Sequence, residues 1–143
     1  MKDVTEKKET LRTSIAESKL TMPPEVQSLM HEGKLEKGDA LEIARVAGVM
    51  AAKKTSEMIP YCHPLALTGV AIDFAFDEDG VRTRATVKTI GPTGVEMEAL
   101  TAASVVALTL YDTLKPHTQT MEIAYVRLLS KTGGKSGDYV YEG

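Results

Sequence analysis

The sequence of 143 residues predicts an α+β fold in which helices pack on one face of a single antiparallel sheet. Two observations predict this class. Four segments alternate between apolar and polar or small residues, as strands do, and two longer segments space their apolar residues as helices do. The order is strand, helices, hairpin, long helix and strand, for which a ferredoxin-like arrangement is the natural candidate. The chain shows no internal repeat and no linker, so we expect one domain over residues 1–143.

The first part of the chain supplies one strand and two helices. Residues 10–21 alternate as a strand, which two consecutive prolines end. Residues 24–32 predict a short helix closed by Gly33, because glycine commonly follows a helix end. A second helix starts after Asp39, a favourable N-cap, and extends to about Lys54.

A loop that contains two prolines separates this helix from a hairpin. The prolines exclude a regular helix or a central strand over residues 59–65. Residues 70–76 and 81–89 then alternate on either side of the turn Asp77–Gly80. This pattern predicts two antiparallel strands joined by a tight turn.

A long helix is predicted over residues 94–116, with carboxylates on both sides of an alanine-rich middle. Glu98 and Asp112 are fourteen residues apart, which places them within roughly 40° of one stripe of the helix. Lys115 follows Asp112 by one turn. A carboxylate and an amine side by side on a rigid helix are well placed for proton transfer. The alternative is a surface ion pair that closes a core helix.

The segments that flank this helix are less regular. Thr93 or Gly94 is expected to cap its start. One more strand is predicted over residues 121–128. The tail, residues 131–143, is glycine-rich, and we expect it to be flexible unless something binds it.

Composition excludes several function classes. A formal net charge of −3 argues against general binding to nucleic acid or to a membrane surface. With five Tyr, two Phe and no Trp, a base-stacking platform is not expected. A single cysteine excludes an internal disulfide and suits a reducing compartment. The charged amino-terminal segment and the absence of a long apolar run predict a cytoplasmic protein.

The loop around His63 admits more than one interpretation. Alone, this histidine could be a hydrogen-bonded structural residue. Zinc is not expected, because the adjacent Cys62 and His63 lack the usual ligand spacing and only His31 and His117 could add to them. The tail segment KTGGKSG resembles a phosphate-binding loop in composition, but it lacks the complete P-loop pattern.

Three long blocks of the chain resemble the signature blocks of one enzyme family. They are IPYCHPLALTGV (59–70), GPTGVEMEALTAASVVALTLYDTLKP (91–116) and VRLLSKTGGKSGDY (126–139). The family is that of the cyclic pyranopterin monophosphate synthases of molybdenum cofactor biosynthesis. Residues 35–55 and the segment DVTEKKETLRTSIA also fit the family's pattern, so the resemblance covers nearly the whole chain.

The resemblance implies a lyase reaction. Its substrate is (8S)-3′,8-cyclo-7,8-dihydroguanosine 5′-triphosphate, and its products are cyclic pyranopterin monophosphate and pyrophosphate. The family uses no redox cofactor, and it acts after the radical enzyme that cyclises GTP. Its ferredoxin-like protomers assemble into a homohexamer, a trimer of dimers, and we expect the sites to lie at subunit interfaces.

The resemblance also assigns residues. The catalytic pair would be Asp112 and Lys115. The implied substrate contacts, which come from the proline-containing loop, the start of the long helix and four basic positions, are Tyr61, Cys62, His63, Glu96, Met97, Glu98, Arg12, Lys37, Lys53 and Lys131. The family usually has a basic residue where Pro92 stands, a departure that leaves the catalytic positions intact.

Residue chemistry is compatible with such a substrate. A triphosphate carries about four negative charges, so a chain of net charge −3 must gather cations locally to hold it. Two rival classes are a regulatory nucleotide-binding module and a structural assembly subunit. A regulatory module needs no acid–base pair, so Asp112 and Lys115 count against it. An assembly subunit leaves the His63 loop and the lysines of the tail without a purpose.

Overall fold

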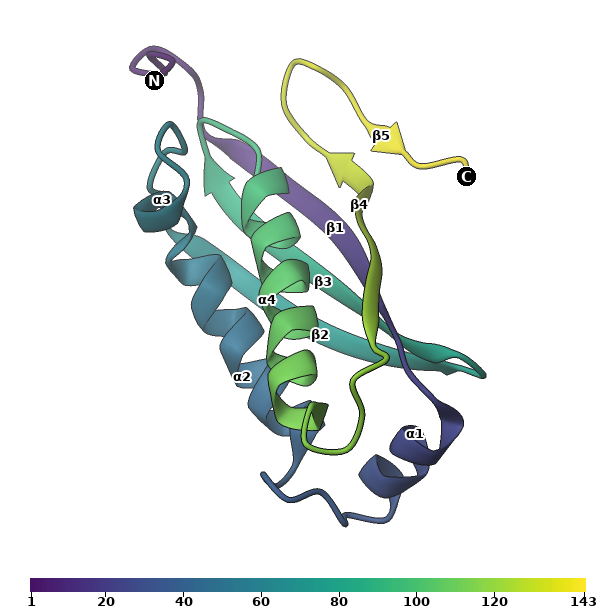
Figure 1. Cartoon of the computed structure of the whole chain (residues 1–143). Helices are drawn as coiled ribbons and strands as arrows, with labels where there is room; N and C mark the ends of the chain where they lie inside the picture. Colours follow the sequence, from purple (N-terminus) through teal and green to yellow (C-terminus); the bar gives the residue numbers. More distant parts are fainter.

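The computed structural model describes residues 1–143 and confirms the α+β fold, with one antiparallel sheet and helices on one of its faces (Figure 1). The strand order is β2-β3-β1-β4-β5. The elements are β1 Thr10–Thr21, α1 Pro24–His31, α2 Ala40–Lys53, α3 Thr55–Met58, β2 Leu67–Asp77, β3 Gly80–Gly91, α4 Glu96–Leu114, β4 Glu122–Thr132 and β5 Tyr139–Val140.

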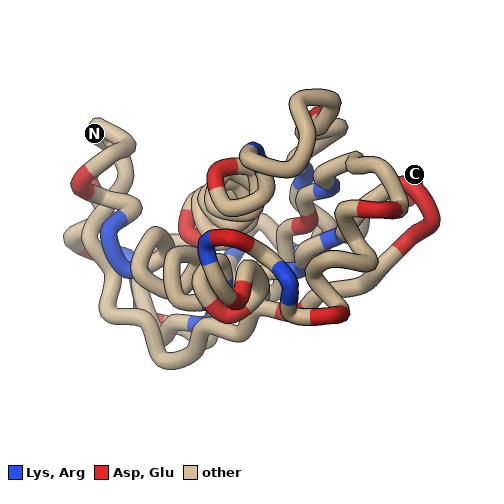
Figure 2. The backbone as a smooth tube through the Cα atoms, turned by 60° about the horizontal axis from the view of Figure 1, so that its bottom comes forward, with Lys and Arg blue, Asp and Glu red and all other residues tan.

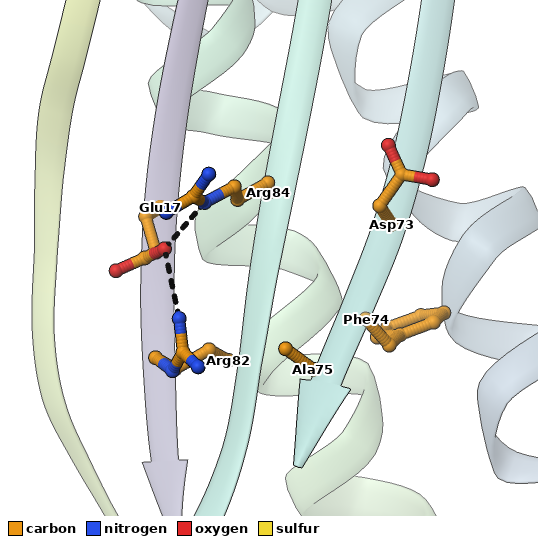
Figure 3. A pocket seen from close by; sticks show the side chains of 6 residues that line it. All are labelled: Glu17, Asp73, Phe74, Ala75, Arg82 and Arg84. Carbon is orange, nitrogen blue, oxygen red and sulfur yellow. Dashed lines mark hydrogen bonds and ion pairs between the residues drawn. The ribbon is translucent and has the colours of Figure 1, made fainter. Parts of the chain in front are cut away.

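Strand β1 lies in the middle of the sheet and shows why alternation predicted the fold correctly. Ala16 and Leu20 are almost fully buried beneath the helices. Glu17 has the opposite phase in the alternation. Its side chain points to the other face of the sheet, and the residue lies opposite Arg84 of β3 (Figure 3). The period-two pattern therefore separates the core from an open, charged face of the sheet.

Helices α2 and α4 form the layer that covers the sheet, and they run in opposite directions (Figure 1). Small residues let them approach closely: Ala99, Ala102 and Ala103 are completely buried, and Gly48 of α2 lies against Val106 of α4. The predicted N-cap of α2 is confirmed, since the side chain of Asp39 accepts a hydrogen bond from the backbone of Glu42. Because the two helices are antiparallel, the carboxyl end of α2 lies beside the amino end of α4.

The predicted cap of the long helix is wrong. Val95 is the N-cap of α4, and no side chain caps the helix start by a hydrogen bond. The carboxylate of Glu96, the first helical residue, instead folds back over Gly94, where a Cβ would collide with Oε1. Gly94 therefore provides space for that carboxylate rather than a cap.

The carboxyl-terminal segment contains more regular structure than the sequence indicated. Strand β4 continues to Thr132, beyond the predicted limit at residue 128. Lys131 pairs with Ser14 of β1 on one side and with Tyr139 of β5 on the other. Pairing to neighbours on both sides explains the extra length. How mobile the glycine-rich part is stays a prediction.

Candidate active site

The sequence-predicted site residues lie at the two ends of α4. Its carboxyl end holds Lys37, Asp112 and Lys115. Its amino end, together with the neighbouring ends of β1, α2 and β4 and the proline-containing loop, holds Arg12, Lys53, Tyr61, Cys62, His63, Glu96, Met97, Glu98 and Lys131. The two groups are separated by about 21 Å, since Glu98 and Asp112 are fourteen residues apart at about 1.5 Å per residue.

Glu98 is the most unusual residue of the amino-end group. It is only 3% exposed, and its Oε1 atom has no hydrogen-bond partner. Its other oxygen accepts a bond of 3.6 Å from the thiol of Cys62. Burial raises the pKa of the Glu98 carboxyl, and the nearby charge of Glu96 acts in the same direction. A buried acceptor without a donor is suited to a ligand that supplies an N–H or O–H group.

Cys62 is a hydrogen-bond donor rather than a nucleophile in this arrangement. Burial, followed by the charge of Glu98, raises the pKa of its thiol to about 11. A thiol with that pKa is protonated at neutral pH, and reactive cysteines require the thiolate. Its role in this structure is therefore to orient the Glu98 carboxylate.

His63 and Arg12 tie other segments to the amino-end group. The Nε2 atom of His63 is 2.6 Å from the carbonyl oxygen of Lys2, so the amino-terminal segment lies against the loop. Arg12 donates from Nε to Gly91 O at 3.0 Å and from Nη2 to Pro92 O at 3.2 Å. These contacts fix the entrance to α4 despite the unusual proline there.

Lys53 lies at the edge of a hollow beside the start of β2. The hollow has a volume of about 470 Å³ and is lined mainly by apolar residues, namely Val49, Leu65, Ala66, Leu67 and Val70. Lys53 is exposed at the end of α2, and Lys131 is half-buried near the end of β4. Both cations are available to an anionic ligand at this end of the molecule.

At the other end of α4, Asp112 lies between two lysines. Its Oδ1 is 2.9 Å from Lys115 Nζ, and its Oδ2 is 3.4 Å from Lys37 Nζ. Lys37 also donates to the backbone oxygen of Asp112 at 2.9 Å. The hydrogen bond and charge of Lys115 lower the pKa of Asp112, and the same pair raises the pKa of Lys115. At neutral pH an ionised carboxylate, able to accept a proton, thus lies beside a charged ammonium group.

One chain does not assemble these residues into a single site. The side chains of Asp112 and Lys115 are 61% and 56% exposed, so within one chain they form a surface ion pair. Of the basic positions, Arg12, Lys53 and Lys131 lie at the opposite end of α4 from Lys37 and Lys115. A rigid helix prevents the two groups from meeting within the chain.

A polar pocket, which sequence reasoning missed, lies on the open face of the sheet (Figure 3). Its volume is about 230 Å³. Glu17 accepts hydrogen bonds from Arg84 at 2.8 Å and from Tyr125 at 2.7 Å. Burial alone would raise the pKa of Glu17, but these partners outweigh it and lower the pKa. Alternation places Glu17 and Arg84 on outward-facing positions, but only the strand pairing shows that they meet.

Figure 2 shows basic and acidic residues intermingled, with both present near the carboxyl end of α4. No three His, Cys, Asp or Glu side chains are grouped so that they could hold a metal ion. None of the helices has the length and apolar character required to cross a membrane.

Comparison with known proteins identifies the family. The family model described as "MoaC family" matches residues 1–134. The chain is 59% identical over 140 residues to the cyclic pyranopterin monophosphate synthase of Brevibacillus brevis, which covers 97% of this chain and 88% of the relative. The same coverage holds for the synthase of Geobacillus kaustophilus at 53% identity, and that of Corynebacterium glutamicum is 54% identical. The chain belongs to the MoaC family.

Proposed function

We propose that this protein is a cyclic pyranopterin monophosphate synthase of molybdenum cofactor biosynthesis. It converts (8S)-3′,8-cyclo-7,8-dihydroguanosine 5′-triphosphate to cyclic pyranopterin monophosphate and pyrophosphate. The observation that carries this proposal is the family match over residues 1–134, with relatives of that name at more than 50% identity over 97% of the chain. The geometry supports it by placing an ionised carboxylate beside a lysine on a rigid helix.

Asp112 and Lys115 form the catalytic pair of this proposal. The reaction requires ring opening, proton transfers and ring closure, and a sugar hydroxyl attacks the α-phosphorus. A P–O bond then forms to that hydroxyl oxygen, while the bond to the leaving pyrophosphate breaks. Asp112 accepts protons as a general base, and the ammonium of Lys115 donates protons and stabilises developing negative charge. Lys37 adds a second cation to the same carboxylate.

The amino end of α4 binds the substrate. Lys53, Lys131 and Arg12 supply cations for the triphosphate, and His63 assists them. The unpartnered Oε1 of Glu98 takes an N–H donor, which the purine-derived ring supplies. The other implied contacts are Tyr61, Cys62, Glu96 and Met97. The glycine-rich tail, residues 131–139, closes over the phosphates when they bind.

The complete site is shared between two copies of the chain. The two groups of residues lie about 21 Å apart along α4, so one reacting centre cannot contact both within a single chain. The proposal therefore brings a partner's Asp112 to this chain's His63 loop. An assembly agrees with the apolar side chains that remain exposed on the helical layer: Ile43, Val46 and Met50 of α2 are 42%, 61% and 43% exposed. A homohexamer built as a trimer of dimers satisfies this requirement with closed symmetry.

The cellular context completes the proposal. The enzyme acts in the cytoplasm on the product of the radical GTP cyclase, without a cofactor of its own. It binds neither nucleic acid nor membrane. A purely regulatory nucleotide-binding module would bind the same triphosphate without releasing pyrophosphate, so turnover separates the two functions.

The test supplies the protein with the product of the radical enzyme and detects oxidised pterin by fluorescence. We expect turnover by the parent chain and a loss of about 10²–10⁴-fold in Asp112→Asn, which removes the titrating group. Asp73→Asn is the matched control, because Asp73 is an exposed carboxylate on the open face of the sheet. Absence of product with the parent chain would overturn the proposed function. Turnover by Asp112→Asn within a factor of two of the parent would remove Asp112 from the mechanism.

A further inference from the structure

The loop between α1 and α2, residues 32–39, is attached to the end of α4 at two points. The first is Lys37, whose Nζ donates to the backbone oxygen of Asp112 at 2.9 Å and lies 3.4 Å from its Oδ2. The second is a backbone contact one residue earlier. The amide N–H of Glu36 donates to the Nε2 atom of His117 at 3.3 Å.

His117 is well placed to act as an anchor for this loop. It lies three residues after the last residue of α4, and its own amide donates to the carbonyl oxygen of Leu114 at 2.9 Å, which fixes the residue to the last turn of the helix. Glu36 and Lys37 are exposed, so little packing constrains them. Leu35 packs against the core and accepts a bond from the Gly38 amide, and the imidazole adds the contact at Glu36, directly beside Lys37.

The chemistry of the contact requires a particular state of the ring. An imidazole nitrogen accepts a hydrogen bond only when it carries no proton, so Nε2 must be bare and the proton of the neutral ring must be on Nδ1. A free lysine side chain loses rotamer freedom when it is fixed. Holding the adjacent backbone restricts where Nζ can reach and so favours its contact with Asp112.

We propose that His117 is a positioning residue, which holds the 32–39 loop so that Lys37 stays against Asp112. Its effect on turnover rests on the proposed function, but its effect on the loop does not. His117 touches neither the substrate-binding end of the chain nor the Asp112 carboxylate itself. It therefore acts through Lys37.

Two substitutions separate the acceptor from the bulk of the ring. His117→Gln retains an acceptor at a similar distance from the backbone, whereas His117→Phe retains a ring without one. Loss of one such hydrogen bond changes an equilibrium by about two- to tenfold. We expect kcat to fall by that factor in His117→Phe and to remain close to the parent value in His117→Gln. His117→Ala replaces the Phe variant if the larger ring prevents folding.

A double-variant cycle identifies the residue through which His117 acts. If it acts through Lys37, His117→Phe lowers kcat in the parent chain but has no further effect in Lys37→Ala. An equal loss in both backgrounds would overturn the proposal, and so would an equal loss in the Gln and Phe variants.

Hydrogen exchange tests the loop without reference to activity. In the intact protein, a peptide that covers residues 33–39 should exchange faster in His117→Phe than in the parent, with His117→Gln close to the parent. Identical exchange in all three proteins would refute the anchoring role. If the parent chain shows no turnover, the proposed function fails and the exchange experiment alone decides this inference.

Discussion

The close packing of α2 against α4, the two helices that position the site, can be tested at Gly48. A Cβ added there would lie 2.5 Å from Val106 Cγ2 and 3.2 Å from Ile72 Cδ1, both inside normal contact distance. Overpacking of a core costs about 1–3 kcal/mol. Alanine gains about 0.8–1 kcal/mol over glycine within a helix. Gly48→Ala should therefore destabilise the protein by a net of up to ~2 kcal/mol, although helix propensity alone predicts the opposite sign.

Thermal and urea unfolding at one fixed protein concentration measure this effect. For a chain of this size we expect the Tm to fall by up to roughly 6 °C. The clash with Val106 can be isolated, because Val106→Ala should cost less in the Gly48→Ala background than in the parent. A Gly48→Ala protein at least as stable as the parent would refute the close packing of α2 on α4. Strict additivity of the two substitutions would refute the contact with Val106.

Three other predictions concern charge and the tail. Because the folded-state pKa of Glu17 is lowered, its ionised form adds stability at neutral pH, and this is lost as pH falls from about 4.5 through the folded pKa. Glu17→Gln should therefore be less stable than the parent by about 1–3 kcal/mol at pH 7, and this difference in unfolding free energy should shrink in acid. Urea midpoints of the two proteins that differ equally at both pH values would contradict this. Lys53→Ala and Lys131→Ala should weaken triphosphate binding, most strongly at low salt, whereas Lys88→Ala should not; calorimetry showing no such difference would place the anion elsewhere. Hydrogen exchange of residues 131–139 should slow when a triphosphate binds, and equal protection with and without it would exclude closure of the tail.

Local chemistry explains why most of the fold could be predicted from sequence. The alternation in β1, the hairpin turn and the N-cap Asp39 depend on residues close together in the chain, and each is confirmed. Two short elements were missed because other contacts stabilise them. The four-residue α3 begins at Thr55, whose hydroxyl bonds back to α2, and β5 exists only through pairing with β4.

For the candidate site, the resemblance supplies a set of residues, which stays a prediction, and no sequence pattern predicted how the set as a whole is arranged. The resemblance assigned the residues, and the i,i+3 spacing of Asp112 and Lys115 predicted their contact, which is confirmed at 2.9 Å. The contacts of Asp112 with Lys37 and of Glu36 with His117 join residues 75 and 81 positions apart. Such contacts depend on how the loop packs against α4, and no local pattern encodes that packing.

The most direct test of the account asks whether two chains build each site. His63→Ala and Asp112→Asn, each inactive alone, are mixed under conditions that exchange subunits. If each site takes the His63 loop from one chain and Asp112 from its partner, random exchange within dimers restores about a quarter of the parent activity. Asp112→Asn mixed with Lys115→Ala is the control, which should remain inactive because both defects lie at the same end of α4. No recovery in the first mixture, with mass spectrometry showing mixed oligomers, would contradict a shared site.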